Sequence, residues 1–341
     1  MAIDPTAYAL TEWRAAIVAE TTAGTINKTS MQLINIDSPA TITRNPYLFT
    51  GVRSGVGRTA KASDVYVSEQ GQEKSISISG LFDKVVGKIL VENCLGVAPV
   101  GNIVSLPYNY TNEVTLGATG IADNIHTLSF VNIVPEGDNS EYYAGCIVDE
   151  LKITMDTASD GGRAKFDATL KTRGNREVAA APTSPKAFGT TVPNIFSFGA
   201  AAAVVKIETL GAAADAILDS LELNFKANAQ WGGLGNNGVG QVINRGMPEF
   251  EVTGIFGVKF DANTVAANTC YLVSGYAGTG TTVAVSIHNA ATLAVSDFGF
   301  TGAYGRITAD VNPEDVRSGA YVKVPVKFMA STAGNIFEVK I

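Results

Sequence analysis

Apolar residues recur at every second position in many separate segments of this 341-residue chain. A period of two places alternate side chains on opposite faces of an extended strand, so each such segment is predicted to be a half-buried β-strand. In EFEVTGIFGVKF, residues 249–260, the apolar face carries Phe250, Val252, Phe256, Val258 and Phe260, with Gly254 interrupting it. The others are SISISG (Ile76, Ile78), DELKITMD (Leu151, Ile153, Met155), AKFDATLK (Phe166, Ala168, Leu170), DSLELNFK (Leu221, Leu223, Phe225), TVAVSIH (Val283, Val285, Ile287) and YVKVPVKF (Val322, Val324, Val326, Phe328).

Clusters of Gly, Asn, Asp and Ser separate these segments, a pattern that favours a mainly β chain folded as antiparallel sandwiches or barrels. Pro325 lies on the polar face of its segment. It predicts an edge strand or a bulge there, because proline has no N–H to donate to a neighbouring strand. Residues 83–95, DKVVGKILVENCL, predict a short helix with Asp83 as its N-cap and Gly96 as its stop.

The N-terminal segment is compatible with two structures. Asp4 followed by Pro5 is a helix-opening signal, and Ala9, Trp13 and Ile17 would then share one helical stripe. The segment AAIVAETT is equally compatible with a strand.

Composition excludes several classes of protein. The hydrophobic content is 46% and the mean hydropathy is +0.16, which suffices for one large core or two ordinary ones. Only 17% of residues are charged and the net charge is −7 without any run of Lys or Arg, so a nucleic-acid-gripping surface is not expected. No apolar run reaches 18 residues, and Asp4 and Glu12 stand where a signal peptide would be basic and apolar. We therefore expect synthesis and assembly in the cytoplasm, with no membrane partner.

Catalytic and metal-binding patterns are weak. Cys94, Cys146 and Cys270 lie far apart and are expected to be small buried side chains. His126 and His288 show no metal-ligand spacing, and no G-x-S-x-G motif occurs. The acidic pairs Asp149/Glu150 and Glu249/Glu251 are typical of the polar faces of strands. We expect no enzyme activity, no cofactor and no metal.

The chain divides at VAAAPTSPKAFGT, residues 178–190, where periodicity stops. We predict a first domain over 1–178, a linker over 179–190 and a second domain over 191–341, each an antiparallel β-sandwich or barrel with a short flanking helix. The two sides share elements in the same order: SISISGLF and EFEVTGIF, then Cys94 and Cys270, LSFVNI and VAVSIHN, GGRAKFDATLK and SGAYVKVPVKF. Such order indicates an internal repeat.

The stretch WGGLGNNGVGQ, residues 231–241, contains G-x-G-x-x-G at Gly233, Gly235 and Gly238. A dinucleotide site needs a helix after this turn, whereas QVINRGMPEFEV alternates with period two and contains Pro248. A glycine-rich hairpin loop is therefore the better interpretation. Its counterpart before SISISG is GVRSGVGRT, residues 51–59, and the two share G-V-G.

Five blocks of the chain form a recognisable combination: WRAAIVAETTAGTINKTSMQLINI, QEKSISISGLF with the helix after it, GCIVDELKITMD, GGRAKFDATLKTRG and YVKVPVKFMASTAGNIFEVKI. Together they resemble the major tail tube protein of long, non-contractile tailed bacteriophages. The resemblance implies a β-sandwich with a flanking helix as one unit of a ring. It also implies that the inner sheets of neighbouring units join into a barrel, and that a long loop or hairpin contacts the next ring.

If the resemblance holds, the protein is a virion component that assembles in the host cytoplasm and conducts double-stranded DNA without binding it specifically. An acidic lumen would suit that passage and the net charge of −7. Its partners would be other copies of itself and the tail-terminator and tape-measure proteins. Two units per chain predict trimeric rings with pseudo-sixfold symmetry, and a hexamer is the alternative. A tail-tip, decoration or surface-binding module is the competing function.

The inter-ring contacts are predicted in two glycine-rich loops. The candidate residues are Gly55, Val56, Gly57, Arg58, Leu234, Gly235, Asn236, Asn237, Gly238, Val239, Gly240 and Gln241.

Overall fold

The structure is a computed structural model. It describes residues 13–50, 65–69, 71–95, 103–107, 127–134, 138–156, 159, 161–189, 204–207, 217–234, 240–245, 249–257, 283–288, 290–292, 299–307, 322–328 and 335–340, and every statement below refers to these residues.

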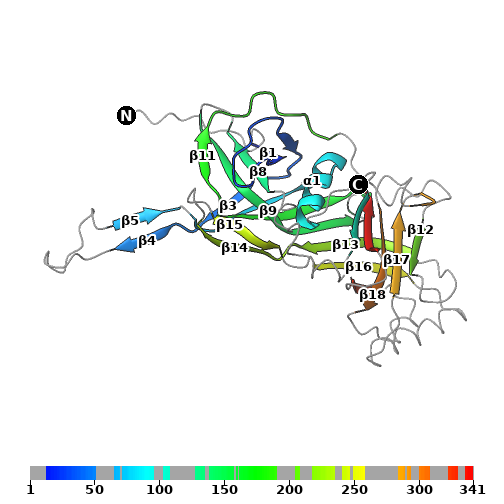
Figure 1. The fold of residues 1–341 in the computed structure, drawn as a ribbon. Coiled ribbons are helices and arrows are strands. Elements are labelled where there is room, and N and C mark those ends of the chain that lie inside the picture. The colour runs from blue at the N-terminus through cyan, green and yellow to red at the C-terminus, as the bar shows by residue number, and fades with distance from the viewer. Residues whose placement is uncertain are drawn as a thin grey trace, which may run out of the picture.

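The described elements are strands, with one helix among them (Figure 1). Up to residue 189 they are β1 (Arg14–Ala19), β2 (Gln32–Ile34), β3 (Thr41–Arg44), β4 (Tyr47–Thr50), β5 (Val65–Ser68), β6 (Lys74–Leu81), α1 (Lys84–Leu95), β7 (Ile103–Pro107), β8 (Leu128–Ile133), β9 (Ser140–Asp156), β10 (Lys165–Thr172) and β11 (Arg176–Ala179). Beyond it they are β12 (Val204–Ile207), β13 (Ile217–Lys226), β14 (Ala229–Leu234), β15 (Gly240–Arg245), β16 (Glu249–Gly257), β17 (Val283–His288), β18 (Gly299–Ile307), β19 (Val322–Phe328) and β20 (Asn335–Lys340).

One large sheet runs through both parts of the chain in the order β12-β17-β18-β19-β16-β13-β9-β10-β6-β3. Every pairing between the named strands is antiparallel. The prediction of a mainly β chain with antiparallel sheets is therefore confirmed.

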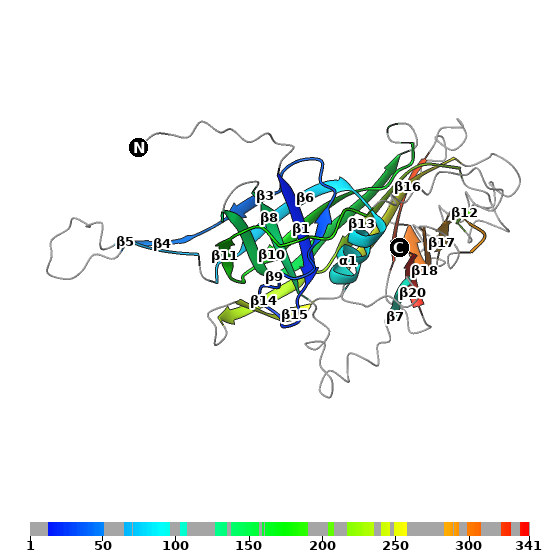
Figure 2. The same cartoon turned by 90° about the horizontal axis from the view of Figure 1, so that it is seen from above.

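The strand β9 belongs to two layers because it is 17 residues long. Its first part pairs with β8 and β11, and its last part pairs with β10 and β13. Figure 2 shows β1 and β8 crossing over β9 and β10, with α1 beside them. The main core lies between these layers, where Ile17, Phe130, Ile76, Phe166 and Leu90 are among its buried members.

The predicted alternation holds wherever side chains are described. Ile76 and Ile78 of β6, the three apolar residues of the DELKITMD segment in β9, and those of β10 and β13 are all buried. The polar residues between them lie on the opposite face, as a two-residue period requires.

The predicted helix is also confirmed, with its cap. The Oδ1 atom of Asp83 accepts hydrogen bonds from the backbone N–H groups of Val85 (2.9 Å) and Val86 (2.8 Å), so it satisfies two of the donors that a helix start leaves unpaired. Val86, Leu90 and Cys94 are buried along one stripe. Gly96 lies outside the described residues.

Two local expectations are settled by strand pairing. Of the two structures compatible with the N-terminal segment, residues 14–19 adopt the strand, paired to β2 and β8. The prediction that Pro325 marks an edge strand is wrong, since β19 lies between β16 and β18. Pro325 is opposite Thr253 of β16, whereas the pairing with β18 covers only Val326 to Phe328. The missing N–H is thus tolerated because the described pairing with β18 does not include Pro325.

The segment after β11 lies along the first part of the chain. The backbone N–H of Leu33 donates to the carbonyl of Lys186 (3.2 Å), and that of Lys186 donates to the carbonyl of Met31 (2.8 Å). Gly189 packs so closely on Asp83 that an added Cβ would lie 2.3 Å from Oδ1. Residues 180–189 therefore form part of the packed structure around α1 and β2.

The order of strand pairing recurs along the chain. Strands pair in the order β1-β8-β9-β10-β6-β3 before residue 190 and in the order β12-β17-β18-β19-β16-β13 after it. β11 also pairs with β9 as β20 pairs with β18. A hairpin, β4–β5 in one case and β14–β15 in the other, follows β3 and β13 respectively.

The recurrence extends to an irregularity. Between Leu128 and Phe130 of β8, the register with β9 shifts from Cys146 to Tyr143. Between Val283 and Val285 of β17, the register with β18 shifts from Gly305 to Gly302. In both cases the partner strand carries one extra residue at the corresponding place, which is a β-bulge.

Candidate functional site

The residues predicted as inter-ring contacts lie at the ends of two equivalent hairpins. Residues 51–64 connect β4 to β5, so Gly55, Val56, Gly57 and Arg58 fall outside the described residues. Residues 235–239 connect β14 to β15 and also fall outside them. Leu234 ends β14, and Gly240 and Gln241 begin β15, with Leu234 and Gly240 in register opposite each other. Of the candidate residues, Leu234, Gly240 and Gln241 are therefore the described ones.

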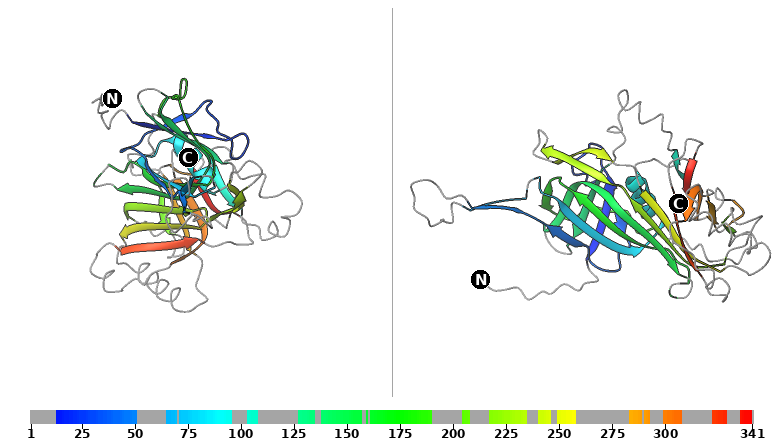
Figure 3. Two further views of the ribbon diagram at one scale, coloured as in Figure 1. Left: turned by 90° about the vertical axis from the view of Figure 1, so that its left-hand side faces the viewer. Right: turned by 90° about the horizontal axis from the view of Figure 1, so that it is seen from below.

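The two hairpins differ in what covers them. The views agree that β4–β5 projects from the body while β14–β15 runs alongside it (Figures 1 and 3). Tyr47 is 50% exposed and Leu48 is 64% exposed. Successive residues of a strand point to opposite faces, so neither face of β4 is covered at this place. Ala229 and Trp231 of β14, in contrast, pack against the main core.

A charged cluster holds the base of the β4–β5 hairpin. Glu141 of β9 accepts hydrogen bonds from Arg44 at the end of β3 (2.7 Å) and from Arg176 of β11 (2.6 Å). Tyr143 donates its hydroxyl to the same carboxylate at 2.8 Å. Burial alone would raise the pKa of Glu141, but the hydrogen bonds from Arg176 and Tyr143 and the charges of both arginines together lower it.

A buried lysine completes this cluster. Lys74, which opens β6, is 2% exposed, and its Nζ donates to the carbonyl oxygens of Gly174 (3.1 Å), Glu69 (3.3 Å) and Gln72 (3.4 Å). Burial lowers the pKa of Lys74, against the opposing effect of Glu69. Arg44, just before β4, is therefore tied to β9 through Glu141, and Lys74, after β5, is tied to Gly174 between β10 and β11, both by charge-assisted hydrogen bonds. Sequence reasoning missed this cluster because its members lie far apart in the chain.

A buried carboxylate holds β9 where it passes from one layer to the other. Glu20 is 7% exposed and accepts hydrogen bonds from the N–H of Gly145 (2.8 Å), the hydroxyl of Ser129 (2.9 Å), the N–H of Gly24 (2.6 Å) and the hydroxyl of Thr127. Gly145 has a φ of 65°, a conformation that glycine adopts without strain. Glu20 thus stabilises the point where β9 passes from one layer to the other.

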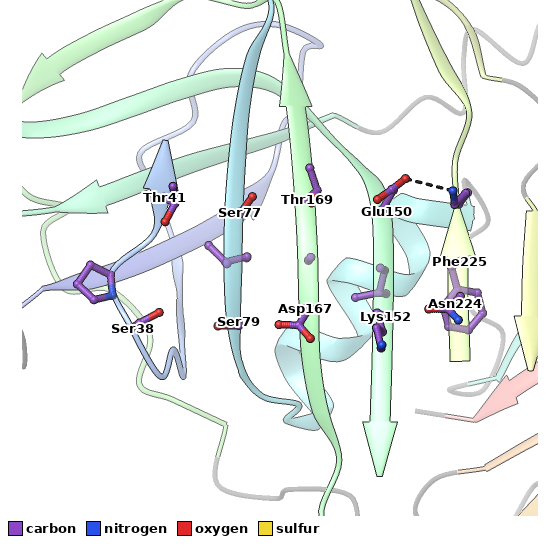
Figure 4. A pocket seen from close by; sticks show the side chains of 15 residues that line it. Ser38, Thr41, Ser77, Ser79, Glu150, Lys152, Asp167, Thr169, Asn224 and Phe225 are labelled. Atoms are coloured by element: carbon purple, nitrogen blue, oxygen red, sulfur yellow. Dashed lines mark ion pairs between the residues drawn. The ribbon is translucent and has the colours of Figure 1, made fainter. Parts of the chain in front are cut away.

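The face of the large sheet opposite the core is polar and hollowed. A groove of about 370 Å³ crosses β3, β6, β10, β9 and β13. Figure 4 shows that hydroxyl groups of Thr41, Ser77 and Thr169 and the charged groups of Glu150, Lys152 and Asp167 lie along neighbouring strands of this face.

The charged residues of this face form ion pairs between strands. The Nζ of Lys171 lies 2.7 Å from Asp149, and that of Lys152 lies 2.8 Å from Glu222. A third pair joins Lys226 of β13 to Glu150 of β9 at 3.3 Å, drawn as the dashed line in Figure 4. The hydrogen bond to Asp149 raises the pKa of Lys171. Three lysines of this face are therefore matched by carboxylates on neighbouring strands.

The residues considered as candidates for cofactor, metal or catalytic sites lie in strands or in the core where they are described. Gly233 lies in β14, and β15 is a strand where a dinucleotide site needs a helix. Cys94 and Cys146 are buried, as predicted, and His288 ends β17 with its Nδ1 2.6 Å from the carbonyl of Ala290. Cys270 and His126 lie outside the described residues.

Among the described residues there is no group of three His, Cys, Asp or Glu side chains arranged to hold a metal ion. The described helix α1 is too short to span a bilayer.

Comparison with known proteins gives no family assignment. No protein-family model matches the chain, and no curated protein matches it in sequence.

Proposed function

We propose that this chain is a structural virion protein whose copies assemble into stacked rings, forming the tail tube through which a long-tailed bacteriophage passes its double-stranded DNA. The observation that carries this proposal is the recurrence of strand order within the chain. In it, β13 of the second set of strands pairs with β9 of the first set. A repeat that adds its edge strand to its neighbour's sheet is the minimal unit of a closed ring.

The recurrence supports two tandem β-sandwich units, for which the boundaries 1–178 and 191–341 with a linker between them remain our prediction. Equivalent positions follow from the register. Ser75 of β6 and Glu249 of β16 occupy the same place in SISISGLF and EFEVTGIF, and their partners are Thr43 and Lys226. Thr43 in β3 is therefore the equivalent of Lys226 in β13.

The same reasoning identifies the equivalent of Glu150. Ser77 and Glu251 are counterparts in β6 and β16, and their partners in the next strand are Thr169 and Lys327. Thr169 is opposite Glu150 of β9, and Lys327 is opposite Arg306 of β18. The pairing Lys226–Glu150 inside the chain thus corresponds to a pairing of Thr43 with Arg306 of a neighbouring copy.

The edge that this pairing needs is available on β3. Among the described residues β3 pairs only with β6, whereas its equivalent β13 pairs on both sides. An unpaired edge is a site for strand addition. Three copies joined in this way present six equivalent units, so we infer a trimeric ring. Ring closure would pair the β3 edge of each copy with β18 of a neighbouring copy.

The hairpins support stacking of rings. A two-stranded hairpin is marginally stable alone in water, and β4–β5 carries the sequences YLFT and VYVS with Tyr47 and Leu48 exposed. Another copy of the chain would cover these apolar side chains. We place the inter-ring contacts on the two hairpins and their glycine-rich connections, and we assign no catalytic role to the chain.

Assembly of the purified protein tests this proposal. Negative-stain images of concentrated protein are expected to show tubes or stacked rings, and native mass spectrometry of isolated rings is expected to give three chains per ring. Rings of six chains would overturn the use of the repeat as a symmetry argument. Discrete particles at all concentrations would favour a tail-tip, decoration or surface-binding module instead.

A further inference from the structure

We infer that the polar face of the large sheet is a charge-balanced surface along which duplex DNA moves without being retained, and that its acidic residues serve to neutralise its lysines. The inference rests on the proposed function, which makes this face the lining of a channel. It assigns a specific role to Asp149, Glu150 and Glu222.

The ion pairs are the first support. Lys171, Lys152 and Lys226 each have a carboxylate oxygen within 3.3 Å on a neighbouring strand. Protein affinity for duplex DNA comes mainly from cations that replace the counterions of the phosphates. A lysine that already has a carboxylate beside it gains less from a phosphate, because the phosphate must compete with that carboxylate.

The register of the strands extends this pattern to the second unit. Glu249 of β16 is in register with Lys226, so that lysine stands between Glu150 and Glu249 in neighbouring strands. One strand further, Glu251 is directly opposite Lys327.

On β10, β9 and β13, the lysines of this face are accompanied by a similar number of carboxylates. The basic residues are Lys152, Lys165, Lys171 and Lys226, and the acidic ones are Asp149, Glu150, Asp156, Asp167 and Glu222.

The balance has a consequence for a polyanion. Neighbouring strands lie about 4.8 Å apart, which is less than the Debye length of about 8 Å at physiological salt. The opposite charges therefore cancel at the distance of a passing phosphate.

Removal of the neutralising carboxylates tests the inference on the soluble protein. The variant E150Q/E222Q releases Lys226 and Lys152 from their pairs. We expect it to bind a fluorescein-labelled 30-base-pair duplex about tenfold more tightly than the wild type at low salt. The slope of log affinity against log salt should become steeper by about 2, or about 0.9 for each released lysine. Fluorescence anisotropy at several salt concentrations measures both quantities.

A matched control separates the face from the net charge. The variant E177Q/D138N makes the same change of charge at exposed positions elsewhere, and releases Lys28, which lies 2.6 Å from Glu177. We expect this control to bind DNA as weakly as the wild type, and we expect K152Q and K226Q added to E150Q/E222Q to abolish the gain. Equal binding by the two double variants would overturn the inference. Failure of the wild type to form rings would instead contradict the proposed function, because DNA binding is measured without assembly.

Discussion

Lys226 of β13 and Glu150 of β9 are directly opposite each other in an antiparallel pair, with 3.3 Å between Nζ and Oε1. Seven successive residue pairs, from Ser220–Asp156 to Lys226–Glu150, join these strands. The two recurring sets of strands therefore share one continuous sheet. β7 makes a second junction, because it follows α1 in the first set and pairs with β20 in the other.

The junction predicts where two copies of the chain can be cross-linked. In T43C/R306C, we expect oxidation to form disulfides between chains, because the proposed ring pairs these residues opposite each other in neighbouring copies. Non-reducing electrophoresis should then show covalent dimers and trimers. E150C/K226C is the internal control and should form its disulfide within one chain. T41C/R306C, which shifts the register by two residues, should cross-link poorly. Equal cross-linking of the two intermolecular pairs would contradict the assigned register.

The exposed hairpin predicts a separation of folding from stacking. Y47S/L48S removes apolar surface that is at least half exposed, so the melting temperature of the soluble protein should change little. Tube length in negative-stain images should fall sharply, while single rings persist. Deletion of residues 234–240 should likewise leave a soluble, folded protein that does not polymerise. Tubes of normal length in both variants would refute the placement of the inter-ring contacts.

Glu141 predicts a loss of stability in acid. Its carboxylate binds Arg44 and Arg176 and has a lowered pKa in the folded protein, so the folded state binds its proton less tightly than the unfolded state. Its contribution is present above the ordinary pKa of 4.5 and is lost as pH falls through the lowered value. E141Q should be less stable than the wild type at neutral pH by about 2–4 kcal/mol, since two arginines lose their counter-charge. The difference in urea midpoints should shrink below pH 4. A difference independent of pH would show that the charge of Glu141 is not responsible.

Asp83 predicts the opposite dependence on pH. Burial raises the pKa of its carboxyl above the ordinary 3.8, against the hydrogen bonds from Val86 and Val85, and its Oδ2 is buried without a hydrogen-bond partner. The folded state thus binds this proton more tightly, so stability falls as pH rises from 3.8 through the raised pKa.

Two substitutions separate the cap from the charge of Asp83. D83N keeps the accepting oxygen and carries no charge, so it should be at least as stable as the wild type at neutral pH. D83A loses the cap and should cost about 1 kcal/mol or more. Thermal unfolding at pH 4 and pH 7 measures both variants. A D83N variant as unstable as D83A at pH 7 would show that the charge is required.

Much of the fold followed from local patterns. The alternation of Ile76 and Ile78, or of Leu221, Leu223 and Phe225, predicted which side chains are buried, because a strand has only two faces and the core accepts only one. The helix after Asp83 and its cap could equally be predicted from the sequence, since a capping side chain contacts residues only two or three positions away.

Only part of the candidate site could be predicted from the sequence. The G-V-G segments precede β6 and β16 in the chain, yet nothing local indicated that the hairpin β4–β5 projects and the hairpin β14–β15 packs. That difference depends on Trp231 and Ala229 contacting the core, whereas Tyr47 and Leu48 remain exposed.

The sequence by itself determined the strands, their buried faces, the helix and the order of the repeat. Only the tertiary structure decided which strands are neighbours: β13 beside β9, β19 between two strands despite Pro325, and Glu141 between Arg44 and Arg176. The reason is that periodicity reports burial, whereas backbone hydrogen bonds between strands are chemically alike for any partner. The choice of partner is made by contacts between residues far apart in the chain.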